Sequence, residues 1–256
     1  LVDDLRPVAL AAPAAAFTEE AGIEIVFDVA PLDEIRVRAA SEGVDIFMAP
    51  HTWRTELEEQ GAVASFDLDT SAFVAAAEEA FGSGTDAVAV PFSAAALVLY
   101  RNTDLWPDAV EDLSDLIAAC DEVPSCLLMP GLGAAGGFHF SAFAMAGSTD
   151  PMPDGLGSAA ARPALRTFER LVTSGALRLE STIAARQAFL AGTVPLFIGG
   201  PWDLGPVEDS GIPFAVQALP SAGATPLRPP VSLLGFHLSA TAPEAEAAQQ
   251  FLERLA

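Results

Sequence analysis

Side chains that could perform catalysis are few in this chain, and their spacing matches no common catalytic pattern. None of the three histidines, His51, His139 and His237, has a Cys, Ser or acidic partner at a recognised spacing, and neither HExxH nor GxSxG occurs. Residues 131–136 match the GxGxxG pattern of dinucleotide sites, but Pro130 interrupts the join between the preceding strand and the turn. We therefore interpret this stretch as a flexible Gly-rich loop, and we expect no enzymatic activity, no cofactor and no metal site.

Two tryptophans on predicted loops are more informative than the histidines. Trp53 follows a predicted strand at residues 45–49, and Trp202 follows another at residues 194–198, within the segment GGPWDL. The face of an indole ring packs well on the apolar face of a sugar and also on a cation. Core packing is the alternative for both residues, because most tryptophans in folded proteins are largely buried.

The chain is strongly acidic. It has 35 Asp and Glu against 12 Arg, no Lys, and a formal net charge of -23. Nucleic acids and anionic lipids bind clusters of Lys and Arg, so this composition argues against both as partners and favours a solvated acidic surface. The longest apolar stretch, residues 87–100, contains Pro91 and is shorter than the ~20 residues that a transmembrane helix needs.

Helices and strands alternate along the sequence. The predicted helices are residues 7–20, 32–40, 52–60, 71–81, 113–120, 138–146, 159–174, 182–191 and 242–255, and the predicted strands are residues 23–29, 45–49, 87–91, 96–100, 126–129, 194–198, 214–219 and 231–239. This alternation is typical of an α/β fold with mostly parallel sheets, and 256 residues are enough for two cores. Ligands of such folds bind at the carboxyl ends of the strands, which is where both tryptophans lie.

Cys120 and Cys126 are separated by a turn that contains proline, in the segment CDEVPSC. The spacing is not that of a zinc site, and no histidine accompanies it. At this point two buried thiols and a short disulfide formed in an oxidising compartment both fit the sequence.

Five stretches of the chain together resemble one protein family. AFTEEAGIEI, DIFMAPHTW, LYRNTDLWP, IGGPWDL and FLERLA occur in the order and spacing of the maltose/maltodextrin-binding proteins, which are extracellular solute-binding proteins of ABC importers. The resemblance runs through nearly the whole chain, and its most specific parts are Y-x-N-x-D-L-x-P at residues 100–107 and G-P-W at residues 200–202. It implies a periplasmic-binding-protein-like α/β fold with two lobes, a hinge and a solute site in the cleft between the lobes.

The resemblance also implies a domain organisation. The N-terminal lobe would comprise residues 1–94, the C-terminal lobe residues 95–228, and residues 229–256 would return to the N-terminal lobe. Members of the family continue for several helices after the last predicted helix of this chain. We therefore expect the chain to be a fragment or a shortened member that lacks those C-terminal helices.

The function that the resemblance implies is binding of a carbohydrate and its delivery to the membrane permease subunits of an ABC importer. Such a protein is exported and works as a monomer, either free in the periplasm or anchored to the cell exterior as a lipoprotein. Export places Cys120 and Cys126 in an oxidising compartment, so a disulfide between them is expected.

Several ligand-binding positions of the family have a counterpart here. Asp4 matches a sugar-binding Asp, and Arg6 could supply the donors of a family Lys that is Leu5 in this chain. His51 matches a family His that follows a strand, and Trp202 matches the family's stacking Trp. We expect these side chains to contact the ligand.

Other positions depart from the family pattern. Thr52 and Trp53 stand where the family has an Asp and an Arg that bind hydroxyls, and Ala95 replaces a binding Glu. Phe138 and His139 lie beside the position of a binding Tyr and are further candidates. Carboxylates and Arg specify sugar hydroxyls, so these losses favour a sugar other than maltose. The alternative ligand is a polyamine or other small cationic solute, held by acidic side chains and indole faces.

Overall fold

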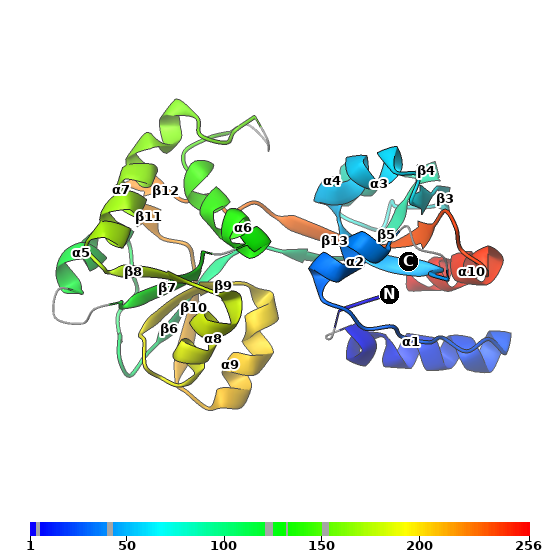
Figure 1. Cartoon of the computed structure of the whole chain (residues 1–256), viewed down its shortest axis with the longest axis horizontal. Coiled ribbons are helices and arrows are strands. Elements are labelled where there is room, and N and C mark those ends of the chain that lie inside the picture. Colours follow the sequence, from blue (N-terminus) through cyan, green and yellow to red (C-terminus); the bar gives the residue numbers. More distant parts are fainter. Residues whose placement is uncertain (4–5, 40–42, 121–124, 132, 150–153) are drawn as a thin grey trace. The chain divides into compact units, whose positions relative to one another are not determined.

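The computed structural model of the chain describes residues 1–3, 6–39, 43–120, 125–131, 133–149 and 154–256, and it divides into two compact units (Figure 1). Unit 1 comprises Leu1–Ala94 and Ser232–Ala256, and unit 2 comprises Ala95–Val231. The resemblance predicts chain crossings after residues 94 and 228, and the contacts in the structure place them after residues 94 and 231.

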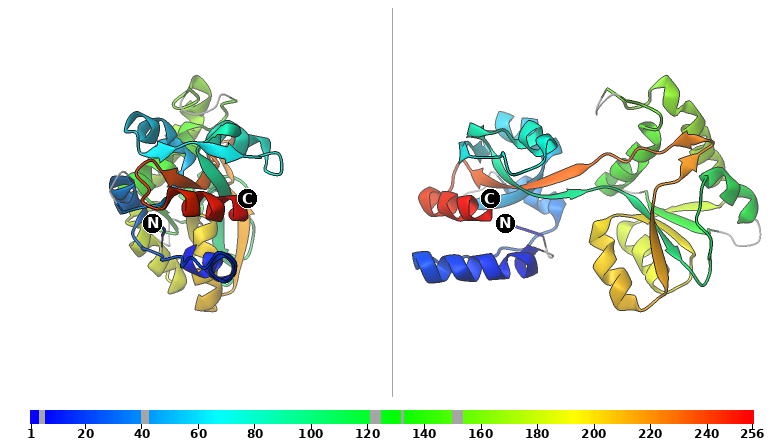
Figure 2. Two further views of the ribbon diagram at one scale, coloured as in Figure 1. Left: turned by 90° about the vertical axis from the view of Figure 1, so that its right-hand side faces the viewer. Right: turned by 180° about the vertical axis from the view of Figure 1, so that it is seen from behind.

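Unit 1 is built on a four-stranded sheet with β13 at its centre. Its elements are α1 (Arg6–Ala21), α2 (Leu32–Arg38), β1 (Ile46–Pro50), the 3₁₀ turn η1 (His51–Trp53), α3 (Arg54–Glu59), β2 (Val63–Ala64), β3 (Phe66–Leu68), α4 (Ala75–Phe81), β4 (Gly84–Ala87), β5 (Ala89–Ala95), β13 (Ser232–Ser239) and α10 (Ala245–Leu255). Strand β13 pairs with β1, β2 and β5, and its register places Leu238 opposite Ile46. Helices cover both faces, with α10 on one side and α3 and α4 on the other (Figure 2).

The pairing in unit 1 departs from the expectation of mostly parallel sheets. Strand β13 runs antiparallel to both β1 and β2, and β3 runs antiparallel to β4. The reason is that β13 belongs to the returning segment of the chain and enters the unit against the direction of β1. The bridge between Val2 and Val29 is parallel.

One strand that the sequence predicts in unit 1 does not form. Residues 23–29 are predicted to form a strand, but within the described residues their pairing is limited to an isolated bridge between Val29 and Val2. The residues of this segment favour a half-buried position in a pleated sheet. That preference alone does not make a strand, because a strand also needs a neighbouring strand that supplies hydrogen bonds.

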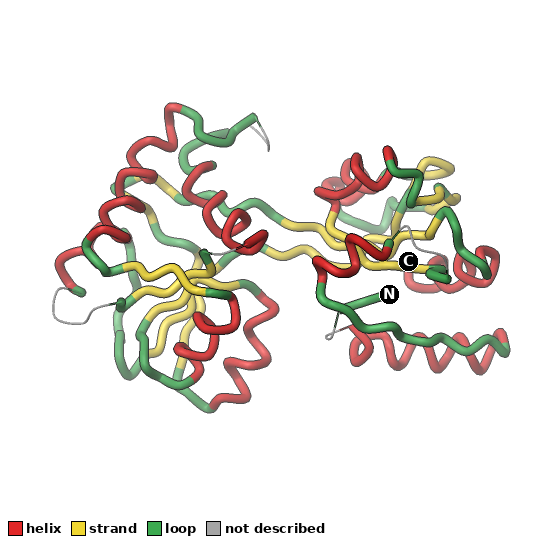
Figure 3. The backbone as a smooth tube through the Cα atoms, in the orientation of Figure 1, coloured by secondary structure: helices red, strands yellow, loops and turns green. Residues whose placement is uncertain are grey.

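Unit 2 contains a five-stranded mixed sheet in the order β10-β6-β9-β7-β8. Figure 3 draws strands in yellow and helices in red. The elements of unit 2 are β6 (Val98–Asn102), η2 (Leu113–Asp115), α5 (Leu116–Ala119), β7 (Leu127–Pro130), α6 (Gly133–Ala144), η3 (Ala159–Ala161), α7 (Arg162–Thr173), β8 (Leu177–Glu180), α8 (Thr182–Leu190), β9 (Leu196–Gly199), η4 (Pro201–Asp203), α9 (Leu204–Ser210), β10 (Phe214–Ala218), β11 (Ser221–Ala222) and β12 (Thr225–Pro226). Strand β7 is parallel to β8 and β9, whereas β6 is antiparallel to β9 and β10.

The Gly-rich segment after β7 is helical and not the flexible loop that the sequence suggested. Helix α6 begins at Gly133 and contains Gly136. A Cβ atom at Gly136 would collide with the backbone of Gly131, so the absence of a side chain permits this close approach. The glycines therefore allow tight packing of the strand-to-helix connection.

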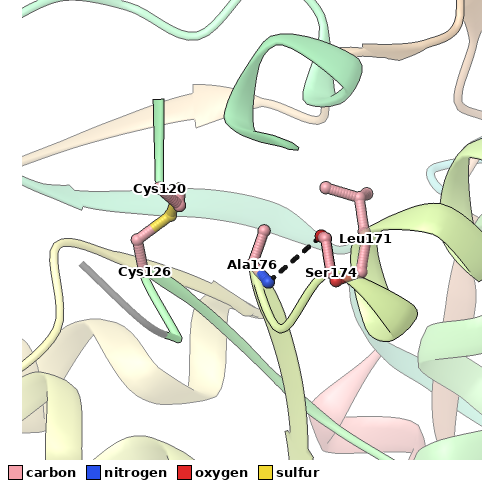
Figure 4. Close-up of a disulfide and its surroundings, with 5 residues drawn as sticks. All are labelled: Cys120, Cys126, Leu171, Ser174 and Ala176. Carbon is pink, nitrogen blue, oxygen red and sulfur yellow. Dashed lines mark hydrogen bonds between the residues drawn. A yellow bond between two sulfur atoms is a disulfide. The ribbon is translucent and has the colours of Figure 1, made fainter. Parts of the chain in front are cut away.

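A disulfide joins Cys120, at the end of α5, to Cys126, just before β7 (Figure 4). Their Cα atoms are 5.9 Å apart, within the usual range for such a bond. Beside it, the backbone N–H of Ser125 donates to the carbonyl oxygen of Gly175 at 2.9 Å. The bond therefore lies in the core of unit 2, where both cysteines are buried.

Candidate functional site

Trp202 lies on a turn that three hydrogen bonds stabilise. It is the central residue of η4, between the buried strand β9 and helix α9. The hydroxyl of Tyr100 donates to the carbonyl oxygen of Gly200 at 2.6 Å, and the N–H of Gly200 donates to Asp203 Oδ2 at 3.0 Å. Arg186 Nε donates to Asp203 Oδ1 at 2.6 Å. These contacts fix the turn that presents the indole.

Asp203 is the central anchor of this turn, because its carboxylate is fully buried and receives both of these hydrogen bonds. A buried carboxylate is stable only when it is paired and hydrogen-bonded, and Arg186 with the Gly200 amide meet that need. Burial, together with the negative charge of Asp203, raises the pKa of Tyr100 to about 12. Tyr100 therefore stays protonated and acts as a donor at neutral pH.

Gly199 and Gly200, which precede Trp202, lie where neighbouring atoms leave no room for a Cβ atom. A Cβ atom at Gly199 would collide with the carboxylate of Asp203, and one at Gly200 would collide with the six-membered ring of the Trp202 indole. Gly200 has φ −135°, an extended backbone that any residue adopts, so backbone strain is not the reason. The indole therefore folds back over Gly200, which gives it a defined orientation.

Phe138 and His139 lie beside Trp202. Their ring centroids are 6.2 and 6.4 Å from the indole, and both residues belong to α6. Trp202 and Phe138 are half-buried, whereas His139 is buried. The structure thus brings together these three predicted site residues as one group of aromatic rings, which we call the Trp202 cluster. Its ring faces can contact the apolar side of a ring-shaped solute.

Arg6 is the predicted site residue of unit 1 with the clearest capacity to bind a ligand. Its guanidinium lies over the ring of Phe92 at 5.3 Å and forms a 3.8 Å ion pair with Asp3. Its Nε is buried, and within the described part of the chain it has no hydrogen-bond partner. A buried donor without a partner lowers stability, so Arg6 Nε is suited to donate a hydrogen bond to an oxygen of a ligand.

Sequence reasoning missed Phe92 and the role of Asp3. Phe92 is 37% exposed, lies in β5 and contacts Phe236 at 4.8 Å. The predicted strand stopped at Pro91, whereas β5 extends to Ala95. Following the alternation of apolar residues through the proline would have extended the strand and placed Phe92 on it.

His51 ties η1 to β13. The backbone N–H of Leu233 donates to His51 Nδ1 at 3.1 Å. The carbonyl oxygen of Leu233 lies farther from Nδ1, at 3.4 Å. The shorter contact therefore assigns Nδ1 as the acceptor of the Leu233 N–H and places the proton of the neutral ring on Nε2. Burial lowers the pKa of His51, so the ring is neutral at pH 7. The observed contact of His51 is therefore structural, and its Nε2–H is the group that remains for a ligand.

Thr52 and Trp53 have different surroundings although they are adjacent. Thr52 is exposed, whereas Trp53 is half-buried against the core of unit 1. The guanidinium of Arg36, on α2, lies over the indole of Trp53 at 5.4 Å. Trp53 thus already contacts a cation of the protein itself. Asp4, the remaining predicted residue, lies outside the described residues.

Among the residues that the structure describes, no three His, Cys, Asp or Glu side chains gather in a way that could hold a metal ion. Within the same residues, no helix is both long enough and apolar enough to cross a membrane.

A family model described as bacterial extracellular solute-binding protein matches residues 12–256. The maltotriose-binding protein of Pyrococcus abyssi is 24% identical to this chain over 220 residues. That match covers 77% of this chain and 47% of the relative, so the chain spans about half the length of the curated relative it matches.

Proposed function

Because the chain belongs to the bacterial extracellular solute-binding proteins, we propose that it is the substrate-binding component of an ABC-type importer and that its ligand is a carbohydrate. In this proposal it binds the solute outside the cytoplasmic membrane, as a monomer, and delivers it to permease subunits in that membrane. It performs no chemistry on the solute.

The observation that carries the carbohydrate proposal is the Trp202 cluster. Tyr100, Arg186 and Asp203 fix the Trp202 turn, so a ligand would meet an indole whose orientation is already set. Preorganisation of this kind reduces the ordering cost of binding. A sugar ring offers an apolar face to aromatic rings, and its hydroxyls need donors such as the buried Nε of Arg6.

We propose that the solute is bound by both units, with Trp202, Phe138 and His139 from unit 2 and Arg6, His51 and Thr52 from unit 1. Trp53 and Asp4 complete the set that the sequence predicts. Binding would then close a hinge at the two chain crossings, after Ala94 and after Val231, because a ligand that touches both units stabilises the closed arrangement.

The choice among sugars follows from Thr52 and Trp53. These residues offer neither the carboxylate nor the guanidinium that pairs with hydroxyls in a bidentate manner, and Arg36 already occupies a position over the Trp53 indole. We therefore favour a sugar other than maltose. Malto-oligosaccharides still belong in any test, because the relative from Pyrococcus abyssi is named for maltotriose.

A screen by thermal shift would test the ligand class, with glucose, trehalose, maltose, maltotriose and cello-oligosaccharides in one arm and putrescine and spermidine in the other. A ligand that binds only the native state raises the melting temperature by mass action, by about 2.7 kcal/mol of stability at 100 times its Kd. The amine arm is included because the net charge of -23 would attract polycations. Stabilisation by amines alone would replace the sugar proposal by the cationic alternative.

Trp202→Ala is the sharpest mutational test of the site. For the sugar identified by the screen, we expect a loss of about 2 kcal/mol in binding, roughly a 30-fold rise in Kd, because an aromatic anchor is removed. Titration calorimetry would compare it with Trp202→Phe, which keeps an aromatic face, as the matched control. An unchanged Kd for Trp202→Ala would mean that this indole serves packing alone.

A further inference from the structure

Arg6 and Phe92 form a small surface of unit 1 in which a cation lies over an aromatic ring. The guanidinium of Arg6 is 5.3 Å from the ring centroid of Phe92, which is exposed on β5. The ring of Phe92 also makes an edge-to-face contact with the buried ring of Phe236, with the two centroids 4.8 Å apart. Phe236 therefore fixes Phe92, and Phe92 in turn positions the guanidinium. We call the pair of Arg6 and Phe92 the Arg6 subsite.

The guanidinium of Arg6 is not hydrogen-bonded to a carboxylate among the described residues. Its side chain is only 15% exposed, and its buried Nε has no partner there. The ion pair with Asp3 joins Nη2 to Oδ2 at 3.8 Å, which is too long for a hydrogen bond. The other oxygen of Asp3, Oδ1, accepts the backbone N–H of Arg6 at 3.2 Å. Asp3 therefore contributes to the start of α1 and leaves the Nε–H of Arg6 without an acceptor.

The charge of Arg6 is poorly compensated by its surroundings. Strands β5 and β13, which carry Phe92 and Phe236, contain no acidic side chain. Arg6 is also the first residue of α1, and the positive end of a helix dipole disfavours a cation. A largely buried cation with one loose ion pair lowers stability unless a further anion joins it. A ligand with a negative charge is therefore a better partner for Arg6 than any group that the described fold supplies.

The chemical group that fits this arrangement is a carboxylate. Its two oxygens match two parallel N–H groups of a guanidinium, and such charge-assisted bonds are about twice as strong as neutral ones. A sugar hydroxyl would satisfy the Nε–H of Arg6 but would leave the charge uncompensated. An ammonium group, as in a polyamine, would be repelled by the guanidinium. The subsite thus favours an anionic solute over a neutral one, and a neutral solute over a cationic one.

We propose that Arg6 and Phe92 form a specificity subsite for the carboxylate of an acidic sugar, such as a hexuronic acid. This inference rests on the proposed function and narrows the carbohydrate to one that carries a negative charge. Arg6 binds the carboxylate through Nε and a terminal nitrogen, and Phe92 is the positioning residue that holds the guanidinium. The net charge of -23 opposes the approach of an anion at long range, but salt screens charges beyond ~8 Å, so the adjacent guanidinium decides the affinity.

Matched pairs of probes test this proposal on the unchanged chain. Thermal shift and titration calorimetry would compare D-glucuronate with D-glucuronamide, D-galacturonate with D-galactose, and trigalacturonate with its methyl ester. We expect at least one acid to bind ~10-fold or more tightly than its neutral partner, because the partner lacks the charge-assisted pair. Equal or tighter binding of the neutral partners would overturn the acidic-sugar inference and leave the proposed function intact. Failure of every sugar, acidic or neutral, to bind would contradict both.

Substitutions at the two residues assign the preference to this subsite. Arg6→Gln should raise the Kd for the acid at least ~10-fold and abolish the preference over the neutral partner, which loses only a neutral hydrogen bond. Arg6→Lys keeps the charge without the planar fork and should retain only part of the preference. Phe92→Leu should reduce the preference by ~3-fold, and Phe92→Tyr, which keeps a ring under the guanidinium, should restore it.

The ratio of the two Kd values separates a role in specificity from a role in folding. A residue that serves only the fold changes the melting temperature of the free protein and lowers the affinity for the acid and for its neutral partner alike. An undiminished preference for the acid in Arg6→Gln would overturn the assignment to this subsite. If that variant does not fold, the same ratio in Arg6→Lys decides, because an unchanged preference there would show that the planar fork does not bind the carboxylate.

Discussion

The two units each contain a turn in which a strand passes through one turn of 3₁₀ helix into an α-helix. In unit 1 this is β1–η1–α3, and in unit 2 it is β9–η4–α9. Each turn carries a tryptophan, but Trp53 is the third residue of η1 whereas Trp202 is the second residue of η4. A 3₁₀ helix has three residues per turn, so one step rotates a side chain by about 120°.

That rotation accounts for the different surroundings of the two indoles. The third position points inward in both turns, and it holds the half-buried Trp53 in η1 and the fully buried Asp203 in η4. The second position holds the exposed Thr52 in η1 and Trp202 in η4. Trp53 therefore anchors the η1 turn, as Asp203 anchors the η4 turn. Trp202 instead lies at the second position of η4, where the anchored turn leaves its indole available to a ligand.

The largest expected effect comes from removal of the anchor in η4. Asp203→Ala should reduce the free energy of unfolding by about 3 kcal/mol, because Arg186 and the Gly200 amide lose a buried charged partner. Denaturation in urea would measure it, with Asp209→Ala, at an exposed position of α9, as the control. An equal loss of unfolding free energy in the two variants would show that Asp203 does not anchor the η4 turn.

A fall in pH should lower the stability of unit 1 more than that of unit 2. His237 is fully buried in β13, and burial lowers its pKa from an ordinary value of 6.5 to about 4. The unfolded state then binds more protons, so the stabilisation is complete above pH 6.5 and is lost as the pH falls toward 4, by about 3 kcal/mol. Amide exchange at pH 7 and pH 4.5 would check it. His237→Gln should remove most of this pH dependence, and its persistence would contradict the assignment.

Reduction of the disulfide should lower the stability of unit 2 more than that of unit 1. Opening the bond between Cys120 and Cys126 releases a loop of about seven residues, which corresponds to about 2 kcal/mol in the chain-entropy model. Exchange of core amides of each unit, with and without reductant, would measure the difference. The pairing itself predicts an intact mass two hydrogens lower than that of the free thiols, and two alkylatable thiols in the exported protein would contradict it.

The smallest expected effect on stability comes from a methyl group at Gly200. Gly200→Ala should cost about 1 to 2 kcal/mol, because the new Cβ meets the Trp202 indole and displaces it. Intrinsic fluorescence should shift, and affinity for the ligand should fall. Gly205→Ala in α9 is the matched control, since a Cβ there meets nothing within 4 Å and alanine favours the helix. A Gly200→Ala variant with unchanged fluorescence would show that the indole does not depend on this contact.

The sequence by itself determined the α/β class, most of the helices and strands, and the family. Long periodic segments such as α7 and α10 were predicted within a few residues, because the pattern of apolar residues is local. It also placed both tryptophans just after strands. Helix α9 was not predicted, since Gly205 and Pro206 oppose a helix locally and its position after the anchored η4 turn outweighs them.

Only the tertiary structure decided which groups meet. Arg6 contacts Phe92, and Trp202 contacts Phe138 and His139, across separations in sequence that no local pattern encodes. The segment 23–29 has the composition of a strand, but among the described residues its pairing is limited to the bridge between Val29 and Val2. Propensity acts within a few residues, whereas hydrogen-bond partners, burial and the direction of a side chain depend on distant parts of the chain, and these determined the candidate site.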